Sequence, residues 1–167
     1  MSILDTSIFS RIRRNHGLEH ATINILSRRS PYRRLGGFSD PNGFYILGDV
    51  STDQVRQAVH EALSRLSAGQ KNLAIHSGCG TNVVVSGFVA GLLSWAGMIG
   101  AKTTREKVGR LPLVILLNVI GFILSQPLGP KVQQRITTSG NMEEMSVKNV
   151  FPLRYGKLAL HRVLTQP

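Results

Sequence analysis

The sequence predicts an α+β protein that combines a small mixed head domain with a transmembrane helical hairpin. The first observation is charge segregation: charged residues are dense up to Lys71, absent over 72–101, dense over 102–110 and absent again over 111–130. The second is a mixture of helical and strand patterns in the charged parts. We therefore expect three regions: an N-terminal α+β polar region (1–80), a transmembrane hairpin (81–130) and a C-terminal tail (131–167) that returns to the polar region.

Composition excludes several classes of protein. The 167 residues are 42% hydrophobic, which rules out disorder along the whole chain. A net charge of +11 occurs without an RNA-binding signature or interleaved aromatic residues, so we expect contact with anionic lipid headgroups and no nucleic acid. A single cysteine excludes an intrachain disulfide and a metal cluster of cysteines alone. The basic residues placed to meet headgroups are Arg11, Arg13, Arg14, Arg28, Arg29, Arg33 and Arg34.

The N-terminal region is predicted to hold a helix, a loop and a strand–helix–strand unit. It lacks the continuous apolar block of a secretory signal and instead begins as an amphipathic helix. Leu18, Ala21 and Ile25 recur at helical offsets, which predicts a helix over 6–29. Glycine, proline and aspartate indicate a loop over 30–43. The next expected elements are a strand at 44–47, a helix at 53–66 capped by Ser51 or Thr52, and a strand at 73–76.

The C-terminal tail is predicted to complete the same sheet. Residues 132–138 are expected to be helical and to end at a turn over 139–141. Strand patterns occur at 146–153 and 158–163, with a turn near Tyr155-Gly156 between them.

The two uncharged stretches are predicted to be membrane helices. Residues 83–101 and 111–130 each approach the roughly 20 residues that cross about 30 Å of hydrocarbon. The alternative is a pair of buried helices in a soluble core, but so small a chain has little protein to cover both on every side. The connector at 102–110 is short enough to make the helices antiparallel.

Small and polar residues in these stretches predict how the helices pack. Gly87 and Gly91 have the spacing that lets membrane helices approach closely, and Asn118 is expected to bond to the other helix. A hairpin places both termini on one side of the membrane, which we expect to be the cytoplasmic side of a bacterial inner or internal membrane. The expected partners are the bilayer with its anionic headgroups and either another membrane protein or a second copy of the chain.

The sharpest local motif is His16-Gly17-Leu18-Glu19-His20. Residues four apart share one helix face, so His16 and His20 can hold one metal ion, with Glu19 as general base to a metal-bound water. The alternative is a pair of helix histidines that bond to backbone or to lipid phosphate. Gly17 costs a helix about 1 kcal/mol relative to alanine, which indicates close packing there.

A second motif is His76-Ser77-Gly78-Cys79-Gly80-Thr81-Asn82, where the strand at 73–76 leads into the first uncharged helix. Cys79 and His76 can complete a metal site with His16 and His20, and three histidines with one cysteine form a closed set typical of structural zinc. Alternatively, Cys79 is a nucleophile with a histidine as base, or a small buried residue in a glycine-rich turn.

Two resemblances accompany these motifs. The H-x-x-E-H order resembles the inverted motif of the inverzincin metallopeptidases, which add a carboxylate ligand on a later helix, and His60-Glu61 is the nearest match. His60 and His161 are otherwise expected to be non-functional. The blocks NHGLEHATI, LGGFSDPNGFYILGDV, HSGCGTN, QPLGP and TTSG resemble a family of small bacterial two-helix membrane proteins of unknown function. That resemblance implies the architecture and assigns no role to any residue.

Three functions remain open from the sequence. The first is a membrane-anchored zinc hydrolase with His16 and His20 as ligands and Glu19 as base. The second is a non-catalytic scaffold or assembly factor in which the His/Cys set binds structural zinc. The third is an enzyme with Cys79 as its nucleophile.

Overall fold

A computed structural model describes residues 7–31, 34–155 and 158–166, with side chains placed at all of these except 154, 155 and 158. The chain divides into two compact units. The first, which we call the head, comprises Met1–His76 and Gln134–Pro167, and the second, which we call the hairpin, comprises Ser77–Gln133.

The head is built on one four-stranded antiparallel sheet with strand order β1-β2-β4-β3. Its strands are β1 (Gly36–Asp40), β2 (Gly43–Leu47), β3 (Ser146–Tyr155) and β4 (Leu158–Gln166). The C-terminal strand β4 lies between β2 and β3, with Val163 opposite both Phe44 and Val150. The tail thus supplies two strands of the sheet that also contains β1 and β2, whereas the predicted turn at Tyr155-Gly156 extends outside the described residues.

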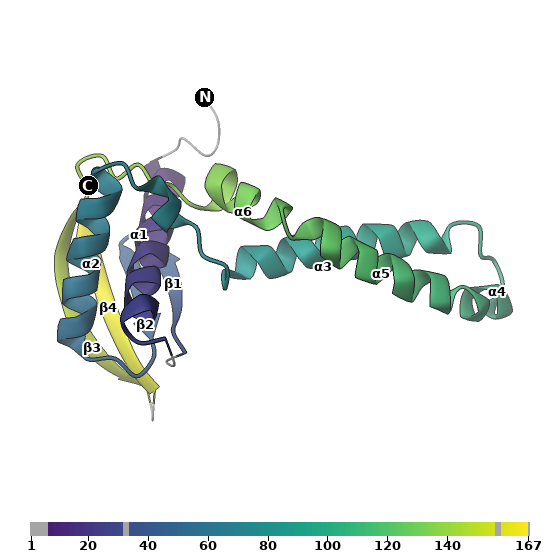
Figure 1. The fold of residues 1–167 in the computed structure, drawn as a ribbon, viewed down its shortest axis with the longest axis horizontal. Coiled ribbons are helices and arrows are strands. Elements are labelled where there is room, and N and C mark those ends of the chain that lie inside the picture. The colour runs from purple at the N-terminus through teal and green to yellow at the C-terminus, as the bar shows by residue number, and fades with distance from the viewer. Residues whose placement is uncertain (1–6, 32–33, 156–157, 167) are drawn as a thin grey trace. The chain divides into compact units, whose positions relative to one another are not determined.

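Two helices cover one face of this sheet, α1 (Ser7–Arg29) and α2 (Thr52–Ser67) (Figure 1). Short helical turns follow at η2 (Lys71–Ala74) and η3 (Gln133–Thr137), the latter within the stretch expected to be helical. The core between helices and sheet is apolar, and its largest fully buried members are Leu18, Phe44, Ile46, Val55, Val59, Leu66, Met142 and Val163.

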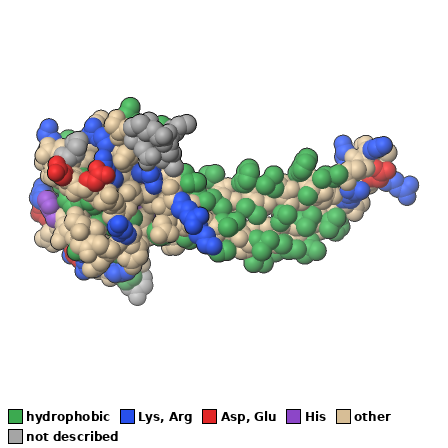
Figure 2. All heavy atoms as spheres, turned by 90° about the horizontal axis from the view of Figure 1, so that it is seen from above, with side chains coloured by type: hydrophobic (Ala, Val, Ile, Leu, Met, Phe, Trp, Pro, Cys, Tyr) green, Lys and Arg blue, Asp and Glu red, His purple; other side chains and the backbone are tan. Residues whose placement is uncertain are grey.

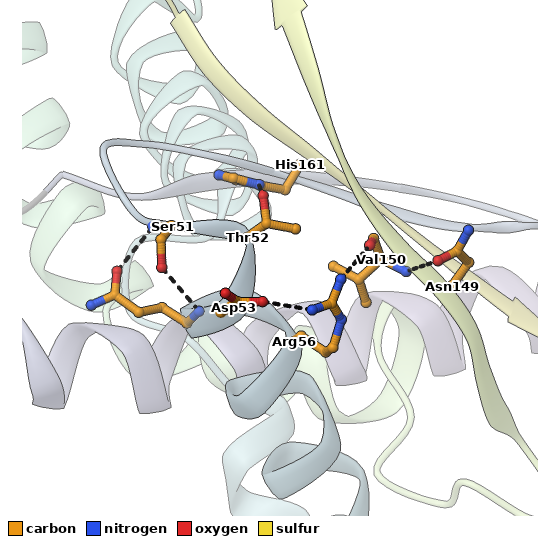
Figure 3. A network of polar contacts seen from close by, with 8 residues as sticks. Ser51, Thr52, Asp53, Arg56, Asn149, Val150 and His161 are labelled. Carbon is orange, nitrogen blue, oxygen red and sulfur yellow. Dashed lines mark hydrogen bonds and ion pairs between the residues drawn. The ribbon is translucent and has the colours of Figure 1, made fainter.

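The α2 helix begins as its sequence predicts. The Gln54 backbone N–H donates to Ser51 Oγ at 3.2 Å, and the Ser51 N–H donates to the Gln54 side chain at 2.9 Å, so Ser51 is the cap. Thr52 instead places its hydroxyl 3.3 Å from His161 Nδ1, and Arg56 donates to Val150 O at 3.3 Å (Figure 3). These contacts tie the start of α2 to strands β3 and β4.

Two sequence expectations about the head are wrong. The loop expected at 30–43 contains strand β1, which forms because Gly36–Asp40 pairs with β2 across the tight turn at 41–42. The strand expected at 73–76 is instead the turn η2 followed by extended chain. Its carbonyl groups need no neighbouring strand, because the amide of Asn24 donates to Leu73 O and Ile75 O at 3.0 Å each.

The hairpin consists of two long helices packed antiparallel, as the short connector predicts (Figure 1). Its helices are α3 (Gly80–Met98), α4 (Thr104–Gly109), α5 (Leu111–Ser125) and α6 (Leu128–Val132). Asn118 Nδ2 donates to Ser94 Oγ at 2.5 Å, so the expected bond to the other helix is confirmed. Gly121 lies against the backbone of Ala90, where an added Cβ would stand 2.8 Å from its Cα.

The surface of the hairpin is apolar. One described helix, Gly80–Met98, is long and apolar enough to cross a membrane, and only 6% of its apolar window is buried. Leu111–Ser125 passes the same test only together with Leu128–Thr137, and the two are bent by 49°. The bend follows Pro127, which has no N–H to continue the helix. Figure 2 shows hydrophobic side chains along these helices, with Lys and Arg at the end that carries α4.

Candidate metal centre

Helix α1 places His16 and His20 one turn apart with their rings in contact, 4.3 Å between centroids. His16 Nδ1 lies 2.9 Å from Thr137 O, and His20 Nδ1 lies 2.8 Å from Ala74 O. His20 is 2% exposed. The two rings are therefore held by main-chain carbonyls from distant parts of the chain. The carbonyl that contacts His20 lies at the end of η2, and the one that contacts His16 lies at the end of η3.

His76 is held close to this pair by Asn24. The ring centroids of His76 and His20 are 5.7 Å apart, and His76 Nδ1 lies 2.8 Å from Asn24 Oδ1. Both amide hydrogens of Asn24 are directed at the carbonyls of Leu73 and Ile75, so its oxygen is the acceptor for the imidazole.

These contacts select one tautomer for all three imidazoles. A carbonyl oxygen only accepts hydrogen bonds, so Nδ1 carries the proton in His16, His20 and His76 alike. The neutral ring then has its lone pair on Nε2, which is the atom that ligates a metal. Metal-binding histidines in proteins are oriented in this way, with the second nitrogen donating to a carbonyl or carboxylate.

Cys79 is the N-cap residue of α3, three residues after His76, and is 7% exposed. Its sulfur accepts from Thr81 N at 3.4 Å. His16, His20 and Cys79 offer two nitrogen atoms and one sulfur atom as candidate metal ligands.

Glu19 lies against strand β1. Its carboxylate accepts from Ser39 Oγ at 2.5 Å, and an added Cβ at Gly37 would overlap its Oε1. Glu19 is buried, so the glycine in β1 makes room for a carboxylate inside the head. The imidazoles contact η2 and η3, whereas this carboxylate contacts β1.

Gly17 marks a close approach, as its place in a helix predicts. An added Cβ would overlap Ser139 O, and Ser139 N donates to Arg13 O at 2.9 Å. The absence of a side chain lets residues 137–139 lie directly on α1, which brings Thr137 O to His16.

The other histidines have different surroundings. His60 is exposed on α2, and the neighbouring Glu61 forms ion pairs with Arg29 and Arg65. His161 is buried with Nε2 2.9 Å from Val50 O, so it connects β4 to the chain before α2.

Asn24 is the site residue that the sequence motifs miss. It continues the His16, His20 series at the next offset of four on α1, and that spacing is the signal that could have found it.

A family model described as a domain of unknown function (DUF6391) matches residues 11–150. The chain belongs to this family. An uncharacterized protein of Picosynechococcus sp. (strain ATCC 27264 / PCC 7002 / PR-6) is 34% identical over 140 residues, which is 77% of this chain and 66% of that relative. No solved structure matches. The part of the chain matched by the DUF6391 model contains His16, His20, His76 and Cys79, the four residues that the sequence predicts as metal ligands.

Proposed function

We propose that this DUF6391 protein is a membrane-anchored zinc protein that scaffolds or assembles a membrane complex, with structural zinc held by His16, His20, His76 and Cys79. The observation that carries the proposal is the shared tautomer of the three imidazoles, whose Nδ1 atoms all meet oxygen acceptors. With Nδ1 protonated, each neutral imidazole carries its lone pair on Nε2, the atom that ligates a metal.

The fourth ligand in this proposal is His76. Two imidazoles on one tetrahedral zinc have ring centroids about 5 Å apart, given a Zn–N bond of about 2.0 Å. The 5.7 Å between His76 and His20 is somewhat longer than that value, and the candidate ligand group of His16, His20 and Cys79 does not include His76. Cys79 follows His76 after two residues, so the same short segment supplies both ligands.

Membrane anchoring is proposed from the exposure of the hairpin. Side chains such as Val83, Phe88, Trp95 and Phe122 are each more than half exposed. A soluble core helix buries such side chains, whereas only 6% of the apolar window of α3 is buried. Lipid would cover this surface, and the polar groups of Asn118 and Ser94 satisfy each other within the hairpin.

The zinc hydrolase is the second candidate, favoured by the motif and by the three-residue group. If His16, His20 and Cys79 were the only ligands, water would take the fourth position, as in catalytic zinc sites. Glu19 would have to leave Ser39 to act as base on that water. We prefer the structural role because Glu19 already has a partner in β1, and because Cys79 is too buried to serve readily as a nucleophile.

Metal analysis of the full chain in detergent tests the proposal. We expect about one zinc per chain, lost in the His16→Ala, His20→Ala double variant and retained in His60→Ala, whose imidazole is exposed on α2. Zinc should also protect Cys79 from alkylation until a chelator is added. An unmodified protein that binds no zinc would exclude both zinc functions.

The coordination sphere separates the two candidates. X-ray absorption of the zinc protein should show one sulfur and three nitrogen ligands, and His76→Ala should lower zinc affinity by about 10- to 100-fold or more. A sphere with two nitrogens, one sulfur and one oxygen, unchanged by His76→Ala, would favour the hydrolase. In that case Glu19→Gln should keep zinc and lose turnover.

A further inference from the structure

The head contains a polar cavity of about 350 Å³ beside α1. Its walls are formed by α1, by residues 71–75 in and after η2, and by residues from 134 to 141. The lining described in the structure includes no aspartate or glutamate. Its polar side chains are those of Arg13, Lys71, Asn72, Gln134, Thr138, Ser139 and Asn141.

Arg13 brings a fixed positive charge to this cavity. Its Nη2 donates to Arg135 O at 3.1 Å and to Thr138 O at 3.3 Å, which holds the guanidinium in one orientation. Its Nε is buried and meets no acceptor among the residues that the structure describes. The guanidinium therefore brings a positive charge to the cavity wall that its carbonyl partners do not neutralise, which favours an anion in the cavity.

Lys71 supplies a second positive charge from the opposite wall. Gly140 packs directly on it, since an added Cβ would stand 2.8 Å from Lys71 Cβ and 3.0 Å from its Cα. The glycine therefore sets how closely the 138–141 segment approaches η2, and with it the width of the cavity. The Lys71 side chain itself is exposed and can turn toward a ligand.

We propose that this cavity binds a phosphate group. Two cations on different walls, with amide and hydroxyl groups around them, suit an anion that offers acceptor oxygens in several directions. A volume of 350 Å³ lies at the small end of ligand sites, enough for a phosphate and part of what it is attached to. Inorganic phosphate and a phospholipid headgroup share this chemistry.

Titration of the full chain in an uncharged detergent with inorganic phosphate tests the site. We expect saturable binding by calorimetry and a rise in the melting temperature of the head with phosphate concentration. Lys71→Gln should weaken the affinity about tenfold, because one charge-assisted contact is lost. Lys148→Gln, an exposed cation on β3 outside the cavity, should leave the affinity unchanged.

A second variant tests the same cavity at a residue whose side chain is exposed, so that a folding defect is not expected. Asn141→Asp places a negative charge in the lining at an exposed position and should abolish phosphate binding while the fold is retained. The proposal would be overturned if the folded unmodified chain showed no saturable phosphate binding. It would also be overturned if Lys71→Gln and Asn141→Asp bound phosphate as tightly as the unmodified chain.

Vesicles distinguish the two sources of phosphate. If the site takes a headgroup, phosphatidylglycerol vesicles should compete with inorganic phosphate through Lys71, and phosphatidylcholine vesicles should compete less. If it takes free phosphate, neither vesicle competes and the phosphate affinity persists. Because the titration is run on protein with and without zinc, its result is independent of the proposed metal centre.

Discussion

His76 donates its Nδ1 proton to the amide oxygen of Asn24 across 2.8 Å, and Asn24 donates in turn to the main chain on either side of Ala74. One asparagine on α1 thereby fixes both the path of the chain before His76 and the orientation of its ring. Ala74 O is in turn the partner of His20 Nδ1, so two imidazoles depend on the same short segment.

A matched pair of substitutions at Asn24 separates its two roles. Asn24→Asp and Asn24→Leu both remove the amide donors, but only the aspartate still accepts from His76 Nδ1. We expect zinc affinity, measured by competition with a chromogenic chelator, to fall about 10- to 100-fold in Asn24→Leu and much less in Asn24→Asp. Equal losses in both variants would show that Asn24 acts only through the backbone of 73–75.

Gly17→Ala should destabilise the head although alanine favours helices. The new methyl group would overlap Ser139 O, and the 137–139 segment would have to move off α1. We expect a net loss of about 1–3 kcal/mol in the free energy of unfolding, measured with urea in detergent. Gly36→Ala is the control, because an added Cβ there meets nothing within 4 Å. A Gly17→Ala protein as stable as the parent would contradict the packing described here.

Asp40 should make the head sensitive to acid. Burial raises the pKa of its carboxyl, but hydrogen bonds from Arg162 and from the Asn42 N–H outweigh this and hold that pKa below its ordinary value of 3.8. Since the folded pKa is the lower one, the stabilisation is complete above the ordinary value and is lost as the pH falls through the folded pKa.

Urea unfolding from about pH 6 to about pH 3 measures this contribution. Asp40→Asn should be less stable than the parent at the upper end, and the difference should shrink toward the lower end. Asp53→Asn, whose carboxylate pairs with Arg56 on an exposed surface, should show little difference at either end. A gap between Asp40→Asn and the parent that stays constant with pH would rule out this role of the carboxyl.

Gly121→Leu should loosen the hairpin. Its side chain would meet the backbone of Ala90, so α3 and α5 would have to separate. We expect the hairpin to unfold at a lower concentration of sodium dodecyl sulfate, by an amount equivalent to about 1–3 kcal/mol. Gly87→Leu adds the same side chain where nothing lies within 4 Å and should be nearly neutral. Loss of stability at Gly87 instead would indicate that this face packs on a second chain.

Local signals explain what could be predicted from the sequence. The helix at 6–29, the Ser51 cap and the two late strands follow from periodicity and capping over a few residues. Strand β1 could not be predicted in this way, because its glycines indicate a loop until pairing with β2 and the fit of Gly37 to Glu19 are known.

The candidate site likewise has parts that local sequence predicts and parts that depend on tertiary contacts. Helical spacing brings His16 and His20 together, and chain order places Cys79 near His76. Helical spacing also places Asn24 on the face of His16 and His20, but its contact with His76, 52 residues away, cannot be read from that spacing. Likewise, η2 has the composition of a strand, but the side chain of Asn24 replaces the neighbouring strand that its carbonyls would require.

Strand β4 is the last element of the chain, yet it occupies the middle of the sheet. Until the ribosome has synthesised β4, strand β2 pairs only with β1, and α1 and α2 lack the β3–β4 half of the sheet on which they pack. Both long helices of the hairpin leave the ribosome before that gap can close. The sheet can therefore close only after both hairpin helices have been synthesised, and a truncation that removes 158–166 should leave α1 and its histidines without the central strand of the sheet.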